Sequence, residues 1–318
     1  MHAKEEVLKM GVSLIERKVC PLCGCGLLDI HIPFPEIPVK RCRACAFIFS
    51  SKLMPGDELH RYYSEDFGSH RHMQGQIVNA TVNTWAFERM LKSSGGTVRN
   101  LLDVGTGYGF FLKAVHQRLD IDVTGVELSR TEANYGNTEL GLDIRNVMLS
   151  EAEVTMNHFD MVTAFEVIEH IADPRGFVAE LAKYVKPGGY MLIMTDNFES
   201  KVARGLGAGF PKWIPHSHIS HFAPSTLERV VADAGLVIIH RMSYTPWELV
   251  LRNFRNRLLC TKKNPSSAFN FSVVLQTEMK GTFPLFRLRL ALNKILAQMR
   301  TVDSLDGALM YVLARKSS

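Results

Sequence analysis

One short segment constrains the fold of this chain more than any other: a buried apolar run that ends in closely spaced glycines. Residues 101–104 read Leu-Leu-Asp-Val, and Gly105, Gly107 and Gly109 follow at alternate positions. Glycines allow a tight turn and let a ligand approach the backbone where a Cβ atom would clash. Residues 110–118 predict a helix whose first N–H groups favour an anion at the same place. The segment predicts a strand–turn–helix unit with a ligand site at the turn.

A carboxylate follows the second predicted strand, at the next position where such a strand–turn–helix unit contacts its ligand. Residues 122–126 predict a second strand, and Glu127 comes directly after it, 18 positions past Gly109. A carboxylate at this position binds both hydroxyls of a ribose. Asp103, two residues before the first glycine, is unfavourable beside a pyrophosphate and favourable beside a cationic cofactor. Together these residues predict a nucleoside-cofactor site.

The motifs that come later decide between cofactor classes. The glycines read G-x-G-x-G, whereas dinucleotide turns usually read G-x-G-x-x-G. Residues 159–165 predict a further strand, E-x-x-E-H-x-x-D-P begins at Glu166, and Lys-Pro-Gly-Gly precedes a strand at 190–195. In this order and spacing the motifs resemble the class I S-adenosylmethionine-dependent methyltransferases, over about residues 77–245 and a last strand near 307–315. A nicotinamide enzyme is the weaker alternative.

The resemblance implies an α/β fold with a doubly wound, seven-stranded, mostly parallel sheet whose last strand is antiparallel. A helix is expected at 176–185, and the sixth and seventh strands at 236–243 and 307–315. Four parts are expected: an N-terminal helix and zinc ribbon in 1–58, the cofactor-binding core in 59–245, a basic, mainly helical insertion in 246–303, and the final strand of the core in 304–318.

Several local features are also expected. Residues 1–18 predict an amphipathic helix, 59–67 a tyrosine-rich connector, 77–92 a helix, and 205–209 a mobile glycine-rich loop over a substrate. Ser225, with Glu228 three residues later, predicts the N-cap and capping box of another helix.

Four of the six cysteines form two close pairs. Cys20 and Cys23 are separated from Cys42 and Cys45 by 18 residues. Four thiolates held by two short turns suit tetrahedral Zn²⁺, so a structural zinc ribbon is predicted over about 19–50. The amino terminus shows no apolar signal segment and no apolar run is long enough to span a bilayer, which favours a cytoplasmic location and makes disulfides the weaker alternative.

The resemblance also implies which residues bind the cofactor. Asp103, Gly105 and Gly107 would hold its methionine end and Glu127 its ribose. Ser150 and Glu151 would border the adenine, although the motif there is blurred. Phe165 completes the expected set, together with Tyr62 over the mouth of the site; packing beneath the ribbon is an equal alternative for Tyr62 and Tyr63.

Two groups of side chains could move a proton from an acceptor hydroxyl. His170 is a candidate general base, with Glu166 orienting it, because an imidazole titrates near neutral pH. The alternatives are that Glu166 and Glu169 bind a divalent ion such as Mg²⁺, or that Glu169 and His170 cap a helix. His218 belongs to a second cluster, in which alternate spacing would turn His216 and His218 to one side and His221 to the other.

The methyl acceptor is less constrained. A small-molecule, glycan or lipid-linked hydroxyl is expected, and RNA is the alternative because zinc ribbons and basic patches occur on RNA enzymes. The net charge is +5, but residues 246–300 hold ten Lys or Arg and two acids, so this segment carries +8 and the remainder −3. The insertion also has an apolar helical stripe, which either packs on the core or docks peripherally on the inner face of a membrane. Its members are Leu285, Leu288, Leu292, Ile295, Leu296 and Met299.

Overall fold

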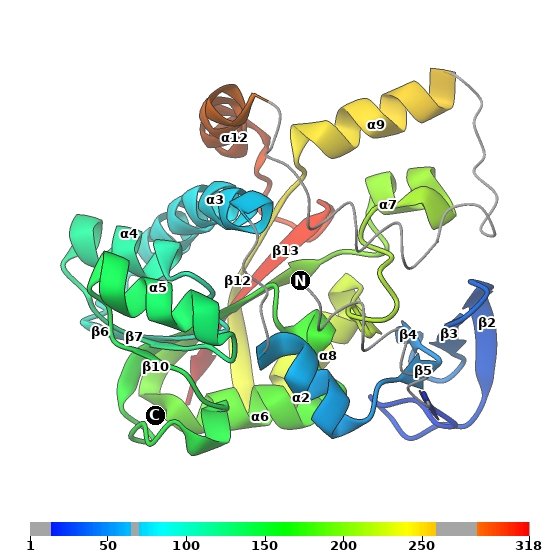
Figure 1. Ribbon diagram of the computed structural model, residues 1–318, viewed down its shortest axis with the longest axis horizontal. Helices are drawn as coiled ribbons and strands as arrows, with labels where there is room; N and C mark the ends of the chain where they lie inside the picture. The colour runs from blue at the N-terminus through cyan, green and yellow to red at the C-terminus, as the bar shows by residue number, and fades with distance from the viewer. Residues whose placement is uncertain (1–13, 65–69, 259–284, 318) are drawn as a thin grey trace.

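The centre of the molecule is a seven-stranded sheet, seen in Figure 1. The computed structural model describes residues 14–64, 70–258 and 285–317. Across the sheet the strands are β12 (Leu236–Tyr244), β13 (Leu309–Lys316), β10 (Val185–Asp196), β9 (Phe159–Phe165), β6 (Asn100–Val104), β7 (Asp122–Val126) and β8 (Ile144–Arg145). β13 is antiparallel to both of its neighbours, whereas the pairs from β10 to β8 are parallel. The expected sheet, with its antiparallel last strand, is confirmed.

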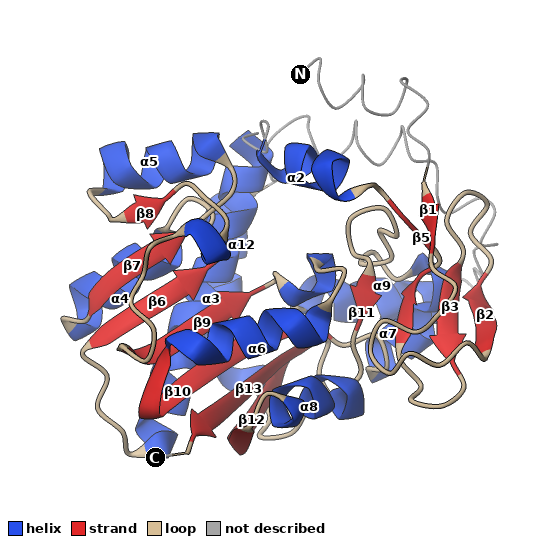
Figure 2. Ribbon diagram, turned by 90° about the horizontal axis from the view of Figure 1, so that it is seen from below, coloured by secondary structure: helices blue, strands red, loops and turns tan. Residues whose placement is uncertain are grey.

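Helices cover both faces of this sheet, as Figure 2 shows. One face is covered by α3 (His70–Ser94) and α4 (Phe110–Leu119), the other by α6 (Pro174–Tyr184) and α8 (Pro224–Asp233). A further helix, α5 (Arg130–Leu140), follows β7. The buried positions of α4 recur at helical spacing, so one side of the helix packs on the strands. The central strand β9 is buried along nearly its whole length because both faces of the sheet are covered.

A second, smaller sheet lies beside the core and is antiparallel. Its strands are β2 (Leu28–Ile32), β3 (Val39–Cys42), β4 (Ile48–Ser50) and β11 (Ser220–His221). The last of these comes from the core segment that carries the histidines. Its pairing with β4 is extended by the Ser50 N–H, which donates to the Ile219 carbonyl at 3.1 Å. The cysteine-bearing ribbon is therefore joined to the core by main-chain hydrogen bonds.

The segments that flank the ribbon differ from expectation. Residues 1–13 of the expected amphipathic helix lie outside the described residues, and Ile15–Glu16 forms a short strand, β1, paired with β5 (Lys52–Leu53). Residues 59–64 of the expected connector belong to a helix, α2 (Gly56–Ser64), whose first turn holds acidic residues that interact favourably with the helix dipole, and residues 65–67 lie outside the described residues. The two tyrosines of the connector are thus presented from a rigid element.

Two further local expectations were wrong. The glycine-rich loop is largely helical: α7 (Lys201–Leu206) is capped by Ser200, and the Trp213 indole N–H donates to the Gly207 carbonyl at 3.0 Å. The N-cap of α8 is Ala223 and not Ser225, because Pro224 takes the first helical position. In the first case, aromatic packing holds the segment in a helix although it is rich in glycine. In the second case, the fixed φ of proline suits the first helical position, so the residue before it becomes the N-cap.

The insertion is helical where it is described, as expected. It comprises α9 (Trp247–Leu258) and α12 (Phe286–Arg300), and residues 259–284 lie outside the described part. The buried side of α12 carries Asn293 and Ala297, whereas Leu288 and Ile295 of the apolar stripe are more than half exposed. Among the described helices, none has the length and apolar character needed to cross a bilayer.

Candidate active site

The glycine turn after β6 is shaped so that a ligand can approach its backbone closely. Gly105 and Gly107 have positive φ angles of +73° and +59°. A Cβ atom on Gly105 would lie 2.4 Å from the Val167 side chain, and one on Gly107 would lie 2.2 Å from Oε1 of Gln76. Both positions favour glycine for their conformation, and at Gly105 the Val167 side chain also occupies the space that a Cβ atom would need. The structure confirms a strand, turn and helix in the expected places.

Glu127 stands against this turn. Its carboxylate accepts hydrogen bonds from the Gly107 and Ser129 N–H groups, each at 2.8 Å. Burial, and then the neighbouring Glu132, raise the pKa of Glu127 to about 7. The carboxylate thus lies at the end of β7, where a ribose would meet it in the expected nucleoside site.

Asp103 is buried beneath the turn. Thr163 donates a hydrogen bond of 2.6 Å to its carboxylate, yet burial raises the pKa of Asp103 to about 7. A cation placed nearby would favour the ionised form. The site therefore fits a positively charged cofactor, which is the property that the sequence suggested for Asp103.

Helix α3 covers the turn through residues that the sequence analysis did not consider. The Tyr108 N–H donates to Oε1 of Gln76 at 3.0 Å, and Nε2 of Gln76 donates to Glu132 at 3.2 Å. His72 lies 3.0 Å from the same Glu132 carboxylate. The helix expected at 77–92 begins earlier, at His70, and no local pattern linked its first residues to the glycine turn.

The remaining residues that were expected to bind the cofactor differ in their exposure and in their contacts. Ser150 and Glu151 are exposed in a short 3-10 helix past β8. Phe165 packs edge-on against Phe111, with ring centroids 4.8 Å apart. Tyr62 is buried and packs against Tyr63 and His216.

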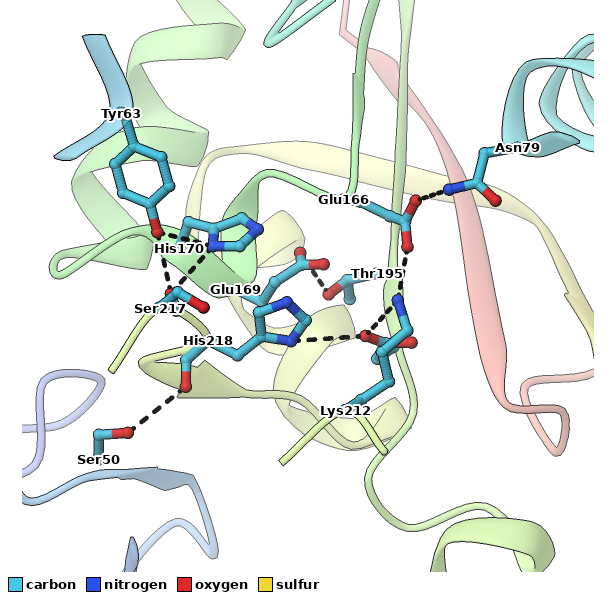
Figure 3. Close-up of polar contacts among 11 residues, drawn as sticks. Ser50, Tyr63, Asn79, Glu166, Glu169, His170, Thr195, Lys212, Ser217 and His218 are labelled. Atoms are coloured by element: carbon cyan, nitrogen blue, oxygen red, sulfur yellow. Dashed lines mark hydrogen bonds and ion pairs between the residues drawn. The ribbon is translucent and has the colours of Figure 1, made fainter. Parts of the chain in front are cut away.

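A second group of polar side chains gathers at the carboxyl ends of β9 and β10 (Figure 3). Glu166 has a φ of +55°, uncommon for a residue other than glycine, and accepts hydrogen bonds from Asn79 and from Lys212, the latter at 2.8 Å. Lys212 also lies 3.4 Å from Asp196. Backbone outliers of this kind cluster at functional sites. Lys212 and Asp196 were missed because neither belongs to a recognisable motif.

The charges of this group depend on Lys212. Burial disfavours ionised Glu166, but the Lys212 ammonium outweighs it and holds the pKa of Glu166 below its usual value. Burial lowers the pKa of Lys212, yet Asp196 and Glu166 raise it overall, so the amine stays protonated. Asp196 has a pKa raised by burial to about 6, and Glu169 one raised by burial and Asp196 to about 8. At pH 7 the group holds one ammonium, two carboxylates and a mostly neutral Glu169.

This arrangement does not fit Mg²⁺. Glu166, Glu169 and Asp196 have oxygens within 4.8 Å of one another, a spacing that a metal could use. An ammonium already neutralises the first and third of these, and Thr195 donates a 2.8 Å hydrogen bond to the second. Mg²⁺ demands near-octahedral oxygen ligands and keeps several waters. The magnesium alternative is therefore not supported.

His170 is held in one orientation by its surroundings. Its Nδ1 atom lies 2.9 Å from both the Tyr63 hydroxyl and the Ser217 carbonyl. A carbonyl can only accept, so we assign the proton to Nδ1, which leaves a lone pair on Nε2. Burial lowers the pKa of His170 to about 4, so the ring is neutral at pH 7. His218 stacks edge-on against it, with centroids 4.7 Å apart.

The three histidines of the second cluster do not alternate. The N–H groups of Ser217 and His218 both donate to the Ile214 carbonyl, so the segment is a turn and the expectation of an extended chain was wrong. His216 contacts Tyr62, and His221 lies between Phe198 and Trp213. Only His218 reaches the polar group, 3.7 Å from Asp196.

The four paired cysteines come together as a separate cluster. Their sulfur atoms all lie within 4.8 Å of one another, with 3.5 Å between Cys20 and Cys45 and 3.6 Å between Cys23 and Cys42. Disulfides would require about 2.05 Å. Tetrahedral Zn–S bonds of about 2.3 Å place sulfur atoms roughly 3.8 Å apart, so the donor set fits Zn²⁺. Cys25 lies outside this set.

A hollow of about 410 Å³ lies elsewhere, lined by residues such as Asn100 and Asp122 at the amino ends of β6 and β7. Ligands of open parallel sheets bind at the carboxyl ends of the strands. The glycine turn, Glu127 and the group around Glu166 all lie at those carboxyl ends, so we place the site there.

The chain is similar to known methyltransferases. A family model described as a methyltransferase domain matches residues 71–241, more than half of the chain. A ubiquinone biosynthesis O-methyltransferase of Rhodopseudomonas palustris is 31% identical over 163 residues, which cover 48% of this chain and 64% of that protein, less than two thirds of its length. One with the same name from Methylococcus capsulatus is 30% identical over 200 residues, 58% of this chain and 84% of the relative. The crystal structure of a SAM-dependent methyltransferase from Thermotoga maritima aligns with a TM-score of 0.47 and 16% identity, covering 81% of this chain and 92% of that one.

Proposed function

This chain belongs to the methyltransferase domain family and is an S-adenosylmethionine-dependent methyltransferase, and from this premise we propose that it methylates a hydroxyl oxygen of a small-molecule acceptor. The cofactor supplies an electrophilic methyl group on a positively charged sulfur. The relatives from Rhodopseudomonas palustris and Methylococcus capsulatus are O-methyltransferases by name, which supports oxygen as the acceptor atom. They lend no support to the RNA alternative.

The observation that carries the cofactor assignment is the glycine turn with Glu127 hydrogen-bonded to it. In this proposal Gly105 and Gly107 admit the methionine end of the cofactor, Asp103 faces its positive charge, and Glu127 binds the ribose hydroxyls. Ser150, Glu151 and Phe165 remain candidates for the adenine side. The cofactor bound here would meet the group around Glu166 through Val167, which touches Gly105.

For catalysis we propose that His170 accepts the hydroxyl proton on Nε2. The Ser217 carbonyl fixes its tautomer, and Tyr63 supports the ring on the same side. Glu166 and His218 flank the imidazole, and the carboxylate would stabilise its protonated form. General-base catalysis of this type contributes roughly 10²–10⁴-fold to the rate.

A labelling assay tests this function. Purified protein with methyl-tritiated S-adenosylmethionine is offered separate panels of ring hydroxyl compounds, sugars and RNA, and the products are identified by mass. O-methylation of a small molecule is expected, with kcat lowered about 10²–10⁴-fold in His170→Ala, cofactor affinity unchanged, and no loss in the exposed control His60→Ala. Label found in RNA alone would overturn the proposal.

The cysteine cluster is proposed as a closed, structural zinc site formed by Cys20, Cys23, Cys42 and Cys45. Four thiolates leave no open coordination position, so this ion would have no direct part in catalysis. Contact of the basic insertion with a membrane surface, and glycan or lipid-linked acceptors, remain predictions for the acceptor screen and for vesicle binding.

A further inference from the structure

Main-chain contacts join the two segments of the chain that carry His170 and His218. The Ile219 N–H donates to the Glu169 carbonyl at 2.8 Å, so the residues next to the two histidines lie against each other. The two imidazole rings pack edge-on, with centroids 4.7 Å apart. The placement of one segment relative to the other therefore sets how the proposed base lies against its neighbour.

Arg17 lies at this junction, although 155 positions separate it from Ala172. Its Nη1 atom donates to the Ile219 carbonyl at 3.2 Å, and its Nη2 atom donates to the Ala172 carbonyl. Ile219 directly follows His218, and Ala172 comes two residues after His170. One guanidinium thus holds both segments.

The ribbon holds Arg17 in place. The Arg17 N–H donates to the Ser51 carbonyl at 2.8 Å, and its own carbonyl accepts from the Lys40 ammonium at 3.4 Å. The guanidinium lies over the Phe49 ring, 5.4 Å from its centroid, where a cation interacts favourably with the aromatic face. The side chain is therefore anchored on β3 and β4 before it reaches the core.

Strand β4 also contacts the histidine segment directly. The Ser50 N–H donates to the Ile219 carbonyl at 3.1 Å, and the Ser50 hydroxyl donates to the His218 carbonyl at 3.4 Å (Figure 3). The Ile219 carbonyl thus accepts from both Ser50 and Arg17. The ribbon and the core meet at the residues beside His218.

The charge of Arg17 is costly to keep at this junction unless its hydrogen bonds are made. Arg17 is partly buried, and burial lowers its pKa to about 10, so the guanidinium stays charged at pH 7. A charge that is removed from water must be paired or hydrogen-bonded to be tolerated. Both terminal nitrogens bond to carbonyls of the histidine segments. The compensation therefore depends on where those segments lie.

Three further cations of the ribbon are paired with carboxylates, which leaves them little positive charge for the phosphates of a nucleic acid. The pairs are Lys40 with Glu16, Arg41 with Glu199 and Arg43 with Asp29. Glu199 belongs to the core, so its pair is a second polar link between the ribbon and the core. The charges of the ribbon thus support contact with the core rather than with RNA.

We propose that Arg17 is a positioning residue for the methyl transfer, and that through it the ribbon fixes the segment of His218 against that of His170. The proposal rests on the proposed function, in which His170 accepts the hydroxyl proton. It assigns the ribbon a role in the reaction that requires no contact with either substrate. The cofactor side should be independent of Arg17, because α3 and Glu127 hold the glycine turn.

The expected effect of losing Arg17 follows from two influences on the His170 ring. Burial lowers the pKa of His170 to about 4, and the Ser217 carbonyl, the weaker influence, raises it. A histidine segment that is no longer held lets water reach the ring and lets Ser217 move away. Because burial is the larger influence, the pKa of His170 should rise toward its ordinary value of 6.5. Glu166, Lys212 and His72, whose charges also act on the ring, are unchanged in the variants.

The experiment uses the full chain bound to S-adenosylhomocysteine and needs no acceptor. The titration of His170 is followed by NMR at its Cε1–H, and the spectrum of His170→Ala identifies the signal. In Arg17→Met the midpoint should rise by at least about one pH unit, a tenfold change in the ionisation equilibrium. The Ile219 N–H should also exchange with deuterium faster than in the wild type. The control Arg43→Met, which changes another arginine of the ribbon, should match the wild type in both measurements.

Arg17→Lys carries the test if Arg17→Met does not fold. A lysine keeps the charge but lacks the planar fork that holds two carbonyls at once, so a smaller rise of the midpoint is expected. An unchanged midpoint in Arg17→Met, or in Arg17→Lys where Arg17→Met is unfolded, overturns the proposal. An equal rise in Arg43→Met also overturns it, because the effect would then belong to the ribbon in general.

Turnover gives a second readout once the labelling assay has identified an acceptor. Displacement of the base should lower kcat by up to about 10²-fold in Arg17→Met, while KM for S-adenosylmethionine stays the same. A rise in that KM with kcat unchanged would contradict a positioning role. Failure of the wild-type chain to bind S-adenosylhomocysteine, or normal turnover in His170→Ala, counts instead against the proposed function.

Discussion

A comparison of two glycines with the same backbone conformation distinguishes the cost of backbone strain from the need for a ligand to approach the backbone closely. Gly105 and Gly141 have φ angles of +73° and +66°, but a Cβ would collide with Val167 at Gly105 and meets nothing within 4 Å at Gly141. Each change to alanine costs about 1–2 kcal/mol for the left-handed backbone. Gly105→Ala should in addition weaken S-adenosylhomocysteine binding at least tenfold (~1.4 kcal/mol) by calorimetry. Equal affinity in the two variants would show that the turn serves only the fold.

A single buried carboxyl should leave a signature in stability. The pKa of Glu169 is raised by burial and by Asp196 from 4.5 to about 8, so the folded state holds this proton more tightly than the unfolded chain. The stabilisation is fully present below about pH 4.5 and is lost as pH rises through about 8. Glu169→Gln cannot ionise and lacks this loss. Between pH 5 and 8 the free energy of unfolding in urea should therefore rise in Glu169→Gln relative to the wild type as pH increases, by up to a few kcal/mol.

The control for this measurement is Glu139→Gln, an exposed residue of α5. Its unfolding free energy should follow that of the wild type at every pH. Parallel curves for Glu169→Gln and the wild type would mean that Glu169 is ionised in the folded protein.

Among the elements, the ribbon offers the clearest test. Cys42→Ser removes one proposed zinc ligand, whereas Cys25→Ser changes a cysteine outside the cluster. Elemental analysis should give one zinc per chain in the wild type and in Cys25→Ser, and less in Cys42→Ser. The melting temperature of Cys42→Ser should fall by several degrees, at about 2–4 °C for each kcal/mol. Zinc absent from wild-type protein made with ample zinc would refute the assignment.

Element-scale expectations succeeded where burial and local propensity agree. The core strands β7 and β9 have the predicted bounds because each is bordered by turn residues and ends in a buried, β-favouring stretch. They failed at α7, where a glycine-rich sequence was expected to be a mobile loop. There a tertiary contact decided, because the Trp213 indole N–H donates to the Gly207 carbonyl.

At the scale of the whole molecule, cofactor binding should stabilise the folded state. The proposed site joins α3, the glycine turn after β6, Glu127 after β7 and the end of β9, four segments far apart in sequence. A ligand that binds only the folded state stabilises it by about 2.7 kcal/mol at a hundredfold excess over Kd. The melting temperature should thus rise with S-adenosylhomocysteine concentration. NAD should leave it unchanged, and an equal rise with NAD would contradict the cofactor assignment.

The sequence by itself determined the features whose residues lie close together along the chain. The turn at Gly105 and Gly107, Glu127 after its strand and the cysteine pairs all express a local geometry, so spacing alone predicted them. Only the tertiary structure decided what surrounds Glu166. Lys212 is 46 positions away and carries no motif, and only the fold brings its ammonium to the carboxylate (Figure 3). Burial then sets the protonation of Glu169 and His170, a property that no spacing in the sequence encodes.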